Sequence, residues 1–474
     1  MTTQTAAPAG TRRIGFESID EELNRDRLPL RGRLPGWLSG TLVRVTPAQL
    51  DVGGAPLRHW FDGLAMLNAF GVADGNVSYG SRFLDTEARR AAREGELGFR
   101  GFAQDPCRSL FKRVMSIVEA PRNDNANVNL MRLGDRYLAM TELPMPVEFD
   151  PETLATLGVQ KYDDRVGGQV TTAHPHHDPD RDEALNYVTQ FGPRSSYRLY
   201  AHPARSNGRR LIAKVGVREP GYMHSFGMSE RYLVLAEFPL LVNPLELGFS
   251  GKPFIHNFRW KPERGTRFIV VDRHSGELRG IYEGPAFFGF HHVNAFERGG
   301  ELVVDLCAYE DPSIIELLEV ERLRDGARLP SVGLQRCRIE LDGGTVDYEP
   351  LAERGMELPR INYRAANTRD YRFAYGVGTR SPESDWSDQL VKVDVRDGEA
   401  RTWHEPGRYP GEPVFVAGPD QRAEDDGVIM SVVLDTSAER SFLLVLDAGS
   451  FEELARAEAP QRIPFGFHGQ FFRS

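Results

Sequence analysis

The sequence is poor in cysteine. Its 474 residues include only Cys107, Cys307 and Cys337, and no two of these form a Cys-x-x-Cys pair. An odd number of cysteines without this spacing argues against a disulfide framework and against a zinc ribbon. We therefore expect a chain that works in a reducing compartment, and the cytoplasm is the location that fits best.

Long apolar runs are also missing. The opening from Met1 to Gly10 is polar and rich in Ala, Thr and Pro, and it has no apolar core of signal-peptide length. No later segment is long and apolar enough to cross a bilayer. We expect a flexible tail over residues 1–12 and a protein that is soluble or, at most, peripheral on a membrane.

Clusters of positive charge are missing, and so are linkers. The formal net charge is −10, and Lys and Arg residues form no run longer than a pair. This distribution argues against nucleic acid as a partner and favours a small or neutral ligand. No Pro- or Ser-rich segment divides the chain, so we expect a single domain over residues 13–474.

Short runs of β-branched and aromatic residues dominate what is present. They are separated by turn signals and include residues 232–236, 267–271, 301–306 and 441–446. A weak repeat accompanies them, in which a strand ends in Asp, turns and re-enters a strand; it occurs at Asp150, Asp272, Asp394 and Asp447. Repeated antiparallel units predict an all-β chain and favour a β-propeller. A β-sandwich, or several β domains, is the alternative.

Two segments are candidates for helices. Residues 85–94 are rich in alanine and charge, and residues 108–118 place five apolar side chains on one helical face with Arg108, Lys112 and Arg113 nearby. The second segment is interpreted either as a helix packed on the core or as a basic-rimmed apolar patch at a membrane interface, through which a lipid-like substrate enters. The apolar residues of segment 239–258 could extend such a patch.

Four of the twelve histidines stand in apolar or turn contexts: His174, His224, His291 and His468. We interpret them as ligands of one buried metal ion. His202, His256, His274 and His404 are interpreted as structural or exposed, and His59 fits either class. In a strand only one of His291 and His292 can face the site, and His174 shares a face with His176 rather than with His177, so spacing alone leaves these alternatives open.

An all-histidine site needs carboxylates around it. A metal-bound imidazole usually donates its second N–H to a carboxylate or carbonyl. Glu142, Glu357 and Glu412 stand in apolar or proline-flanked settings where a solvated charge is unexpected. Zinc is the main rival metal, but structural zinc prefers thiolates and catalytic zinc usually takes three protein ligands, so an open His-only site suits iron.

The chain resembles the carotenoid cleavage oxygenase family, which also contains the retinoid isomerohydrolase of the visual cycle. The resemblance spans nearly the whole sequence. It rests on ordered blocks: His59-Trp-Phe-Asp-Gly, Thr172-Ala-His-Pro-His, Met223-His-Ser-Phe-Gly, Phe290-His-His-Val-Asn-Ala-Phe-Glu, Leu302-Val-Val-Asp-Leu-Cys-Ala-Tyr-Glu-Asp, Glu357-Leu-Pro-Arg-Ile-Asn-Tyr, Glu424-Asp-Asp-Gly-Val and Phe467-His-Gly.

This resemblance implies a seven-bladed β-propeller, with a few helices and loops forming a cap over the metal face. It implies Fe(2+) held on the propeller axis by His174, His224, His291 and His468. Glu142, Glu357 and Glu412 would be the partners of His224, His291 and His468 in that order, and His174 would lack a glutamate. Val128 matches the position that crowds one open iron site, and Thr141, Phe290 and Phe467 would line the substrate cavity.

The family relationship also implies an activity. Members typically split one C=C bond of a conjugated polyene with O2 into two aldehydes or ketones, and they use no organic cosubstrate. Stilbene-cleaving members have a lysine where this chain has Thr141, so a carotenoid or apocarotenoid is favoured, with retinal-like products. The alternatives are a stilbene- or phenylpropenoid-cleaving dioxygenase, an O2-independent retinoid isomerohydrolase, and a non-catalytic propeller that binds an isoprenoid or a protein.

Overall fold

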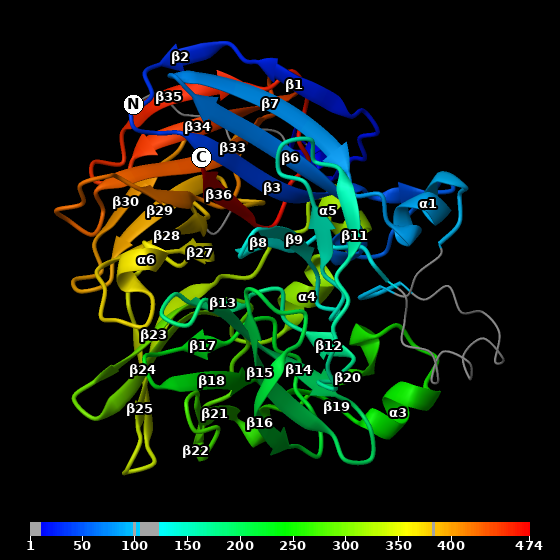
Figure 1. The fold of residues 1–474 in the computed structure, drawn as a ribbon, viewed down its shortest axis with the longest axis vertical. Helices are drawn as coiled ribbons and strands as arrows, with labels where there is room; N and C mark the ends of the chain where they lie inside the picture. The colour runs from blue at the N-terminus through cyan, green and yellow to red at the C-terminus, as the bar shows by residue number, and fades with distance from the viewer. Residues whose placement is uncertain (1–10, 98–100, 105–122, 382–383) are drawn as a thin grey trace.

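Seven antiparallel sheets, arranged as the blades of a β-propeller, make up most of the molecule (Figure 1). The computed structural model describes residues 11–97, 101–104, 123–381 and 384–474. The expected all-β, seven-bladed fold is therefore confirmed. The first sheet contains, from one edge to the other, β1 (Leu23–Arg27), β7 (Asn76–Phe83), β6 (Leu64–Ala73), β3 (Gly40–Gln49) and β36 (Gly469–Arg473). The second sheet contains β8 (Asn129–Leu133), β9 (Arg136–Met140), β10 (Val147–Phe149) and β11 (Thr156–Val159). The third sheet contains β12 (Val170–Thr171), β13 (His176–Asp178), β14 (Glu183–Gln190), β15 (Ser196–Pro203) and β16 (Arg210–Gly216).

The remaining four sheets continue the ring. They are β17 (Gly227–Met228), β18 (Tyr232–Glu237), β21 (Thr266–Asp272) and β22 (Leu278–Gly284); β23 (His292–Arg298), β24 (Glu301–Ala308), β25 (Gly333–Glu340) and β26 (Val346–Pro350); β27 (Glu357–Arg360), β28 (Phe373–Gly378), β29 (Gln389–Asp394) and β30 (Ala400–Trp403); β31 (Arg408–Pro410), β32 (Val414–Ala417), β33 (Gly427–Asp435), β34 (Arg440–Asp447), β35 (Glu453–Glu458) and β2 (Leu30–Gly32). Two small pairs stand apart, β4 (Asp51–Val52) with β5 (Ala55–Pro56) and β19 (Leu240–Val242) with β20 (Phe258–Trp260).

The two ends of the chain close the ring together. The C-terminal strand β36 pairs with β3 from Arg44↔Gly469 to Gly40↔Arg473. Strand β2, near the N-terminus, pairs with β35 and so belongs to the last sheet, which also contains β31 to β34. Strands from both ends of the chain thus join the first and last blades, which closes the ring of blades.

The repeated Asp marks one recurring hairpin turn, between the third and fourth strands of a blade. At Asp272 the backbone N–H donates to Glu277 O at 2.9 Å, and the side chain accepts from the N–H groups of His274 and Ser275 at 2.9 Å. Equivalent turns begin at Asp150, Asp394 and Asp447. The fourth residue after each Asp has positive φ, and it is glycine at 276 and 398 but Leu154 and Phe451 elsewhere. The side-chain hydrogen bonds thus hold a backbone conformation that non-glycine residues rarely adopt.

Helices are few and short among the described residues. They are α1 (Glu87–Arg93), α3 (Pro244–Phe249), α4 (Ser313–Leu317), α5 (Val320–Arg324) and α6 (Tyr363–Ala366), with 3-10 turns at Thr11–Phe16, Trp60–Asp62, Ile255–Asn257 and Pro262–Arg264. The helix expected within 85–94 is confirmed as α1, and the Thr86 side chain accepts from Arg89 N at its start. None of the described helices is long and apolar enough to cross a membrane.

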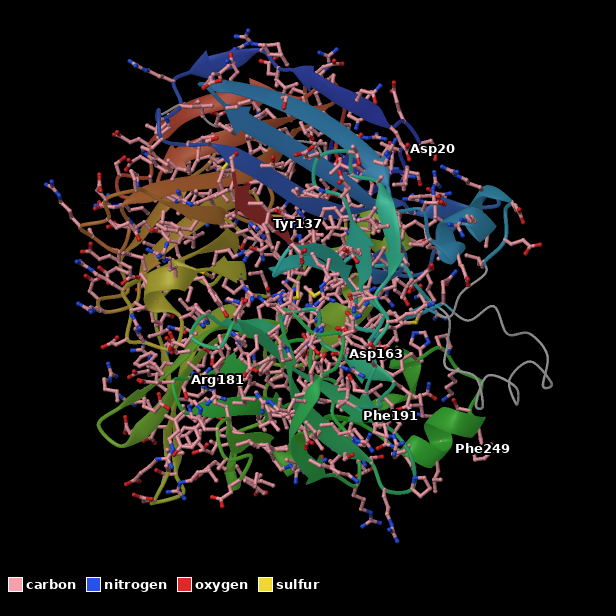
Figure 2. The ribbon with its side chains drawn as sticks, viewed as in Figure 1. Asp20, Tyr137, Asp163, Arg181, Phe191 and Phe249 are labelled. Atoms are coloured by element: carbon pink, nitrogen blue, oxygen red, sulfur yellow. The ribbon has the colours of Figure 1, made fainter. Side chains whose placement is uncertain are left out.

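The apolar segment 239–258 is only partly the exposed patch that its sequence suggested. Leu240, Leu241, Val242 and Phe258 are buried, because β19 and β20 pair with one another against the core. Leu245 and Phe249 on α3 are 59% and 82% exposed, and Phe249 lies at the rim of the molecule (Figure 2). The exposed apolar surface here is therefore one face of α3. The candidate segment 108–118 lies outside the described residues.

Candidate metal centre

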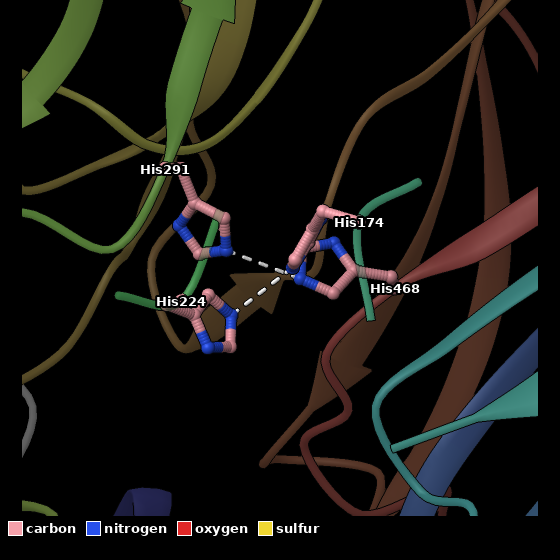
Figure 3. A group of neighbouring side chains, drawn as sticks. All are labelled: His174, His224, His291 and His468. Atoms are coloured by element: carbon pink, nitrogen blue, oxygen red, sulfur yellow. Dashed lines mark hydrogen bonds between the residues drawn. The ribbon is translucent and has the colours of Figure 1, made fainter. Parts of the chain in front are cut away.

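The four histidines meet at the centre of the ring. The side-chain nitrogens of His174, His224, His291 and His468 all lie within 4.8 Å of one another (Figure 3). Nε2 of His174 is 3.0 Å from Nε2 of His224, and Nε2 of His291 is 3.2 Å from Nε2 of His468. Each histidine comes shortly before the edge strand of a different sheet, namely β13, β17, β23 and β36. Strand ends that converge on the axis thus bring together residues that are far apart in sequence.

Glutamates from the other three sheets hold the ring nitrogens that face away from the centre. His224 Nδ1 is 2.6 Å from Glu142, His291 Nδ1 is 2.5 Å from Glu357, and His468 Nδ1 is 2.7 Å from Glu412. These are the expected pairings, in the expected order. Each of the seven sheets therefore contributes one residue to the group, four of them histidines and three glutamates.

The donor chemistry fits a cation. An Nδ1 that donates its hydrogen to a carboxylate leaves a lone pair on Nε2. His291 and His468 both donate in this way, so two lone pairs face one another across 3.2 Å. Such an arrangement is repulsive unless a positive charge lies between the nitrogens, and a divalent metal ion would supply that charge.

Burial favours the neutral form of three of the imidazoles, those of His174, His224 and His468. Loss of solvation lowers the pKa of His468 to about 3, against the opposing influence of Glu412. Burial and the three neighbouring histidines lower the pKa of His174 well below its ordinary value. Burial also lowers the pKa of His224, although the hydrogen bond to Glu142 opposes the shift. Neutral imidazoles are the form that binds metals, so these side chains need no deprotonation to do so near pH 7.

The structure shows which histidines of the neighbouring sets 174/176 and 291/292 lie outside the group of four. His176 and His292 point away from it and form hydrogen bonds elsewhere. His292 Nδ1 is 2.8 Å from Ser225 Oγ, and His176 contacts Tyr363 OH at 3.0 Å and Phe226 O at 2.9 Å. His59 lies outside the group: its Nδ1 accepts from Phe61 N, and its Nε2 donates to Ile315 O at 2.9 Å. His202, His256, His274 and His404 also lie outside it.

His174 has no glutamate and is fixed through its backbone instead. Its N–H donates to Thr172 Oγ1 at 3.0 Å, and the Thr172 hydroxyl donates to His224 O. Asn129 holds Ala173 O and Asn186 holds Thr172 O, each at 2.9 Å. These positioning residues were missed from the sequence. Thr172 stands inside a quoted family block, but no local pattern distinguishes Asn129 or Asn186 from other asparagines in strands.

Two cavities meet beside the histidines. The first has a volume of about 340 Å³, reaches His224, His291 and His468, and includes the aromatic residues Phe290 and Phe467 in its wall. The second has a volume of about 390 Å³, contains Thr141 and Glu142 in its wall and extends to α3, where Phe249 is part of its lining. Phe61 and Val128 belong to both walls and so lie at the junction. All four residues expected to line the substrate cavity do line one or both cavities.

Asp62 secures the described part of the loop beside the second cavity. Its carboxylate accepts from Phe102 N at 2.5 Å and from Ala103 N at 3.0 Å. Burial raises the pKa of Asp62 to about 7, against the opposing influence of these backbone hydrogen bonds. The side chain belongs to the block His59-Trp-Phe-Asp-Gly, so the sequence marked the position but not this role.

A propeller that gathers four imidazoles on its axis, three of them backed by glutamates, has a group of side chains that could hold a metal ion. Comparison with known proteins identifies the class of protein. The family model of RPE65, the retinal pigment epithelial membrane protein, matches residues 16–473, and the chain belongs to this family. The enzyme is a dioxygenase of the family.

Relatives cover almost the full length of the chain. The mitochondrial carotenoid-cleaving dioxygenase of Macaca fascicularis is 35% identical over 93% of this chain and 90% of that protein. The chloroplastic carotenoid cleavage dioxygenase 8 homolog A of Oryza sativa subsp. japonica is 36% identical over 95% of this chain and 86% of that protein. Among solved structures, a mutant of Synechocystis apocarotenoid oxygenase superposes with a TM-score of 0.88 at 26% identity, covering 99% of this chain and 100% of that chain.

Proposed function

We propose that the protein uses one Fe(II) ion, held by His174, His224, His291 and His468, to cleave a C=C bond of an apocarotenoid or carotenoid with O2. The observation that carries this proposal is the convergence of four imidazoles beside the junction of two largely apolar cavities. Iron suits the site because all four donors are imidazoles and no thiolate lies among them. The bound ion would supply a centre at which O2 is activated.

The protein's own residues hold the polyene beside that centre. The two cavities lie on either side of the junction at Phe61 and Val128, so an extended chain can pass the histidines with one arm in each cavity. Phe61 packs against the His224 and Phe290 rings with centroids 6.1 and 5.8 Å apart. These aromatic walls exclude water and fix the alkene relative to the metal, and neither task requires a proton donor.

The polar lining residues of the first cavity favour an oxygenated end group on the substrate. They include Ser331, Arg354, Thr379 and Arg380. No described residue pairs with the Arg354 guanidinium, whereas Arg380 lies 3.9 Å from Asp388. A hydroxyl, aldehyde or carboxylate would find hydrogen-bond donors here, and a pure hydrocarbon would leave them unused. An apocarotenoid, which carries such a group, therefore fits better than an unoxidised carotene.

The exposed face of α3 offers a route for so apolar a substrate. Leu247, Gly248 and Phe249 of α3 line the second cavity, while Leu245 and Phe249 project apolar surface to the exterior. An apolar face next to a cavity mouth suits peripheral contact with a lipid surface, from which a polyene could enter without crossing water. We propose this contact for α3, and propose a cytoplasmic location for the protein.

Product analysis tests the proposed reaction. Protein loaded with Fe(II) is incubated with a β-apocarotenal in air, and the products are identified by mass spectrometry over a panel of C20 to C40 polyenes. We expect two carbonyl products from one double bond, and no turnover under strict anaerobiosis. Product formation without O2 would instead support an isomerohydrolase. Cleavage of resveratrol with the apocarotenoids left intact would support a stilbene-cleaving enzyme.

A further inference from the structure

Two arginines flank Glu412, the carboxylate that holds His468. Arg44, in β3, donates from Nη1 to Glu412 Oε2 at 3.3 Å. Arg360, at the end of β27, donates from Nε to Glu412 Oε1 at 2.9 Å. The side chains of Arg44 and Glu412 are 4% and 1% exposed, and that of Arg360 is 21% exposed. Arg360 Nη2 also donates to Glu412 Oε2 at 3.3 Å, so Arg360 contacts both oxygens of the buried carboxylate and Arg44 contacts one of them. The two cations together compensate the charge of Glu412.

The same arginines also hold the backbone on both sides of His468. Arg44 Nη2 donates to Phe467 O at 2.8 Å, and Arg360 Nη2 donates to Gly469 O. Gly469 N in turn donates to Glu412 Oε2 at 2.9 Å. A Cβ at position 469 would come within 2.7 Å of Arg44 Cγ, so glycine allows the arginine to approach this closely. His468 is therefore fixed through its ring and through both adjacent residues.

The other two glutamates have no such cations. Glu142 accepts a second hydrogen bond from Tyr222 OH at 2.8 Å, and Glu357 accepts one from Leu358 N at 3.0 Å. Within the described part of the chain, neither forms an ion pair with an arginine or lysine. A carboxylate without a compensating cation draws the imidazole proton more strongly and makes the ring a stronger electron donor. The three carboxylate-backed histidines are therefore unequal.

We propose that Arg44 and Arg360 are positioning residues of the metal centre. They fix the orientation of His468 through Glu412 and the backbone, and they keep this ligand a weaker electron donor than His224 or His291. Their positive charges also favour the ferrous over the ferric ion, because like charges repel more strongly as the metal charge rises. This inference rests on the metal site of the proposed function.

The test measures metal binding and potential rather than turnover. Arg360→Met removes the charge and the fork of donors, whereas Arg360→Lys keeps the charge alone. Removal of the charge alone would strengthen binding of a cation, but we expect the lost orientation of His468 to outweigh this effect. Arg360→Met should therefore lose about 10–100-fold in Co(II) affinity, measured by competition with a chelator. The ferric/ferrous potential of the iron-loaded variant should fall. Arg360→Lys should restore the potential but only part of the affinity.

Arg209→Met is the matched control, because Arg209 also forms a buried ion pair, with Asp164 at 3.0 Å, but does not contact the histidines or their glutamates. It should keep the wild-type affinity and potential. Wild-type values for both quantities in Arg360→Met would overturn the proposal. If Arg360→Met does not fold, Arg360→Lys and Arg44→Lys decide by the same two measurements, and unchanged affinity in both contradicts the role. Failure of the wild-type protein to bind Co(II) would instead refute the four-histidine site.

Discussion

The candidate metal centre and the proposed entrance to it are built in opposite ways. Each of the seven sheets gives one histidine or glutamate to the centre, so its geometry is fixed by the closure of the whole ring. The entrance is made of short local elements, namely α3 and the described loop residues 101–104, with Phe249 exposed at the rim. The contrast suggests that the chemistry depends on the ring and the choice and delivery of substrate on the local elements.

Removing one histidine should have the largest effect. His291→Ala deletes a nitrogen donor and leaves Glu357 buried without its partner. We expect loss of metal binding and of all cleavage activity, while the propeller still folds, because the seven sheets do not depend on this ring. Iron content, product formation and circular dichroism would be measured together. Retained cleavage by a folded variant would show that the centre is not the site of chemistry.

Changing a glutamate should have a smaller effect on the same centre. Glu357→Gln and Glu142→Gln keep the shape of the side chain but remove the charge that holds His291 and His224. We expect each to lower metal affinity by about 10–100-fold. Equal affinities for the two variants and the wild type, by chelator competition, would contradict the role of these carboxylates.

Asp62 connects the ring to the entrance and should make stability depend on pH. Its pKa of about 7 in the folded protein lies above the ordinary value of 3.8, so the folded state binds the proton more tightly than the unfolded state. The contribution to the free energy of unfolding is therefore full below about pH 4 and is lost as the pH rises through 7. Urea unfolding measured at pH 5 and pH 8 should show that the free energy of unfolding of the wild type falls between the two pH values, relative to that of Asp62→Asn. A constant difference between the two proteins would exclude this titration.

The smallest effect is expected at the entrance. Leu245→Glu places a charge on the exposed face of α3, and we expect weaker binding to lipid vesicles and a KM raised a few-fold for vesicle-borne substrate, with kcat unchanged. Leu278→Glu, at a leucine that is 49% exposed on β22, is the control and should alter neither quantity. Vesicle flotation and kinetics measure both. Equal behaviour of the two variants would remove α3 from the delivery of substrate.

The sequence predicted the centre better than the entrance, for physical reasons. Histidines and glutamates in apolar settings stand out in a sequence, and the recurring Asp turns revealed repeated hairpins. The choice of His291 over His292 required knowledge of which face of the strand meets the axis. Arg44 gave no signal, because an arginine that alternates with valines in a strand is usually exposed. The exposed part of segment 239–258 was overestimated because the pairing of β19 with β20, which buries their side chains, is not visible in hydropathy.

X-ray absorption at the iron edge of the Fe(II)-loaded protein tests the central claim most directly. The account predicts one iron per chain with four imidazole nitrogens in its coordination shell, and the loss of one of them in His174→Ala, the ligand that has no glutamate. A shell containing sulfur, or a shell unchanged by that substitution, would contradict the assignment of the four histidines as the metal ligands.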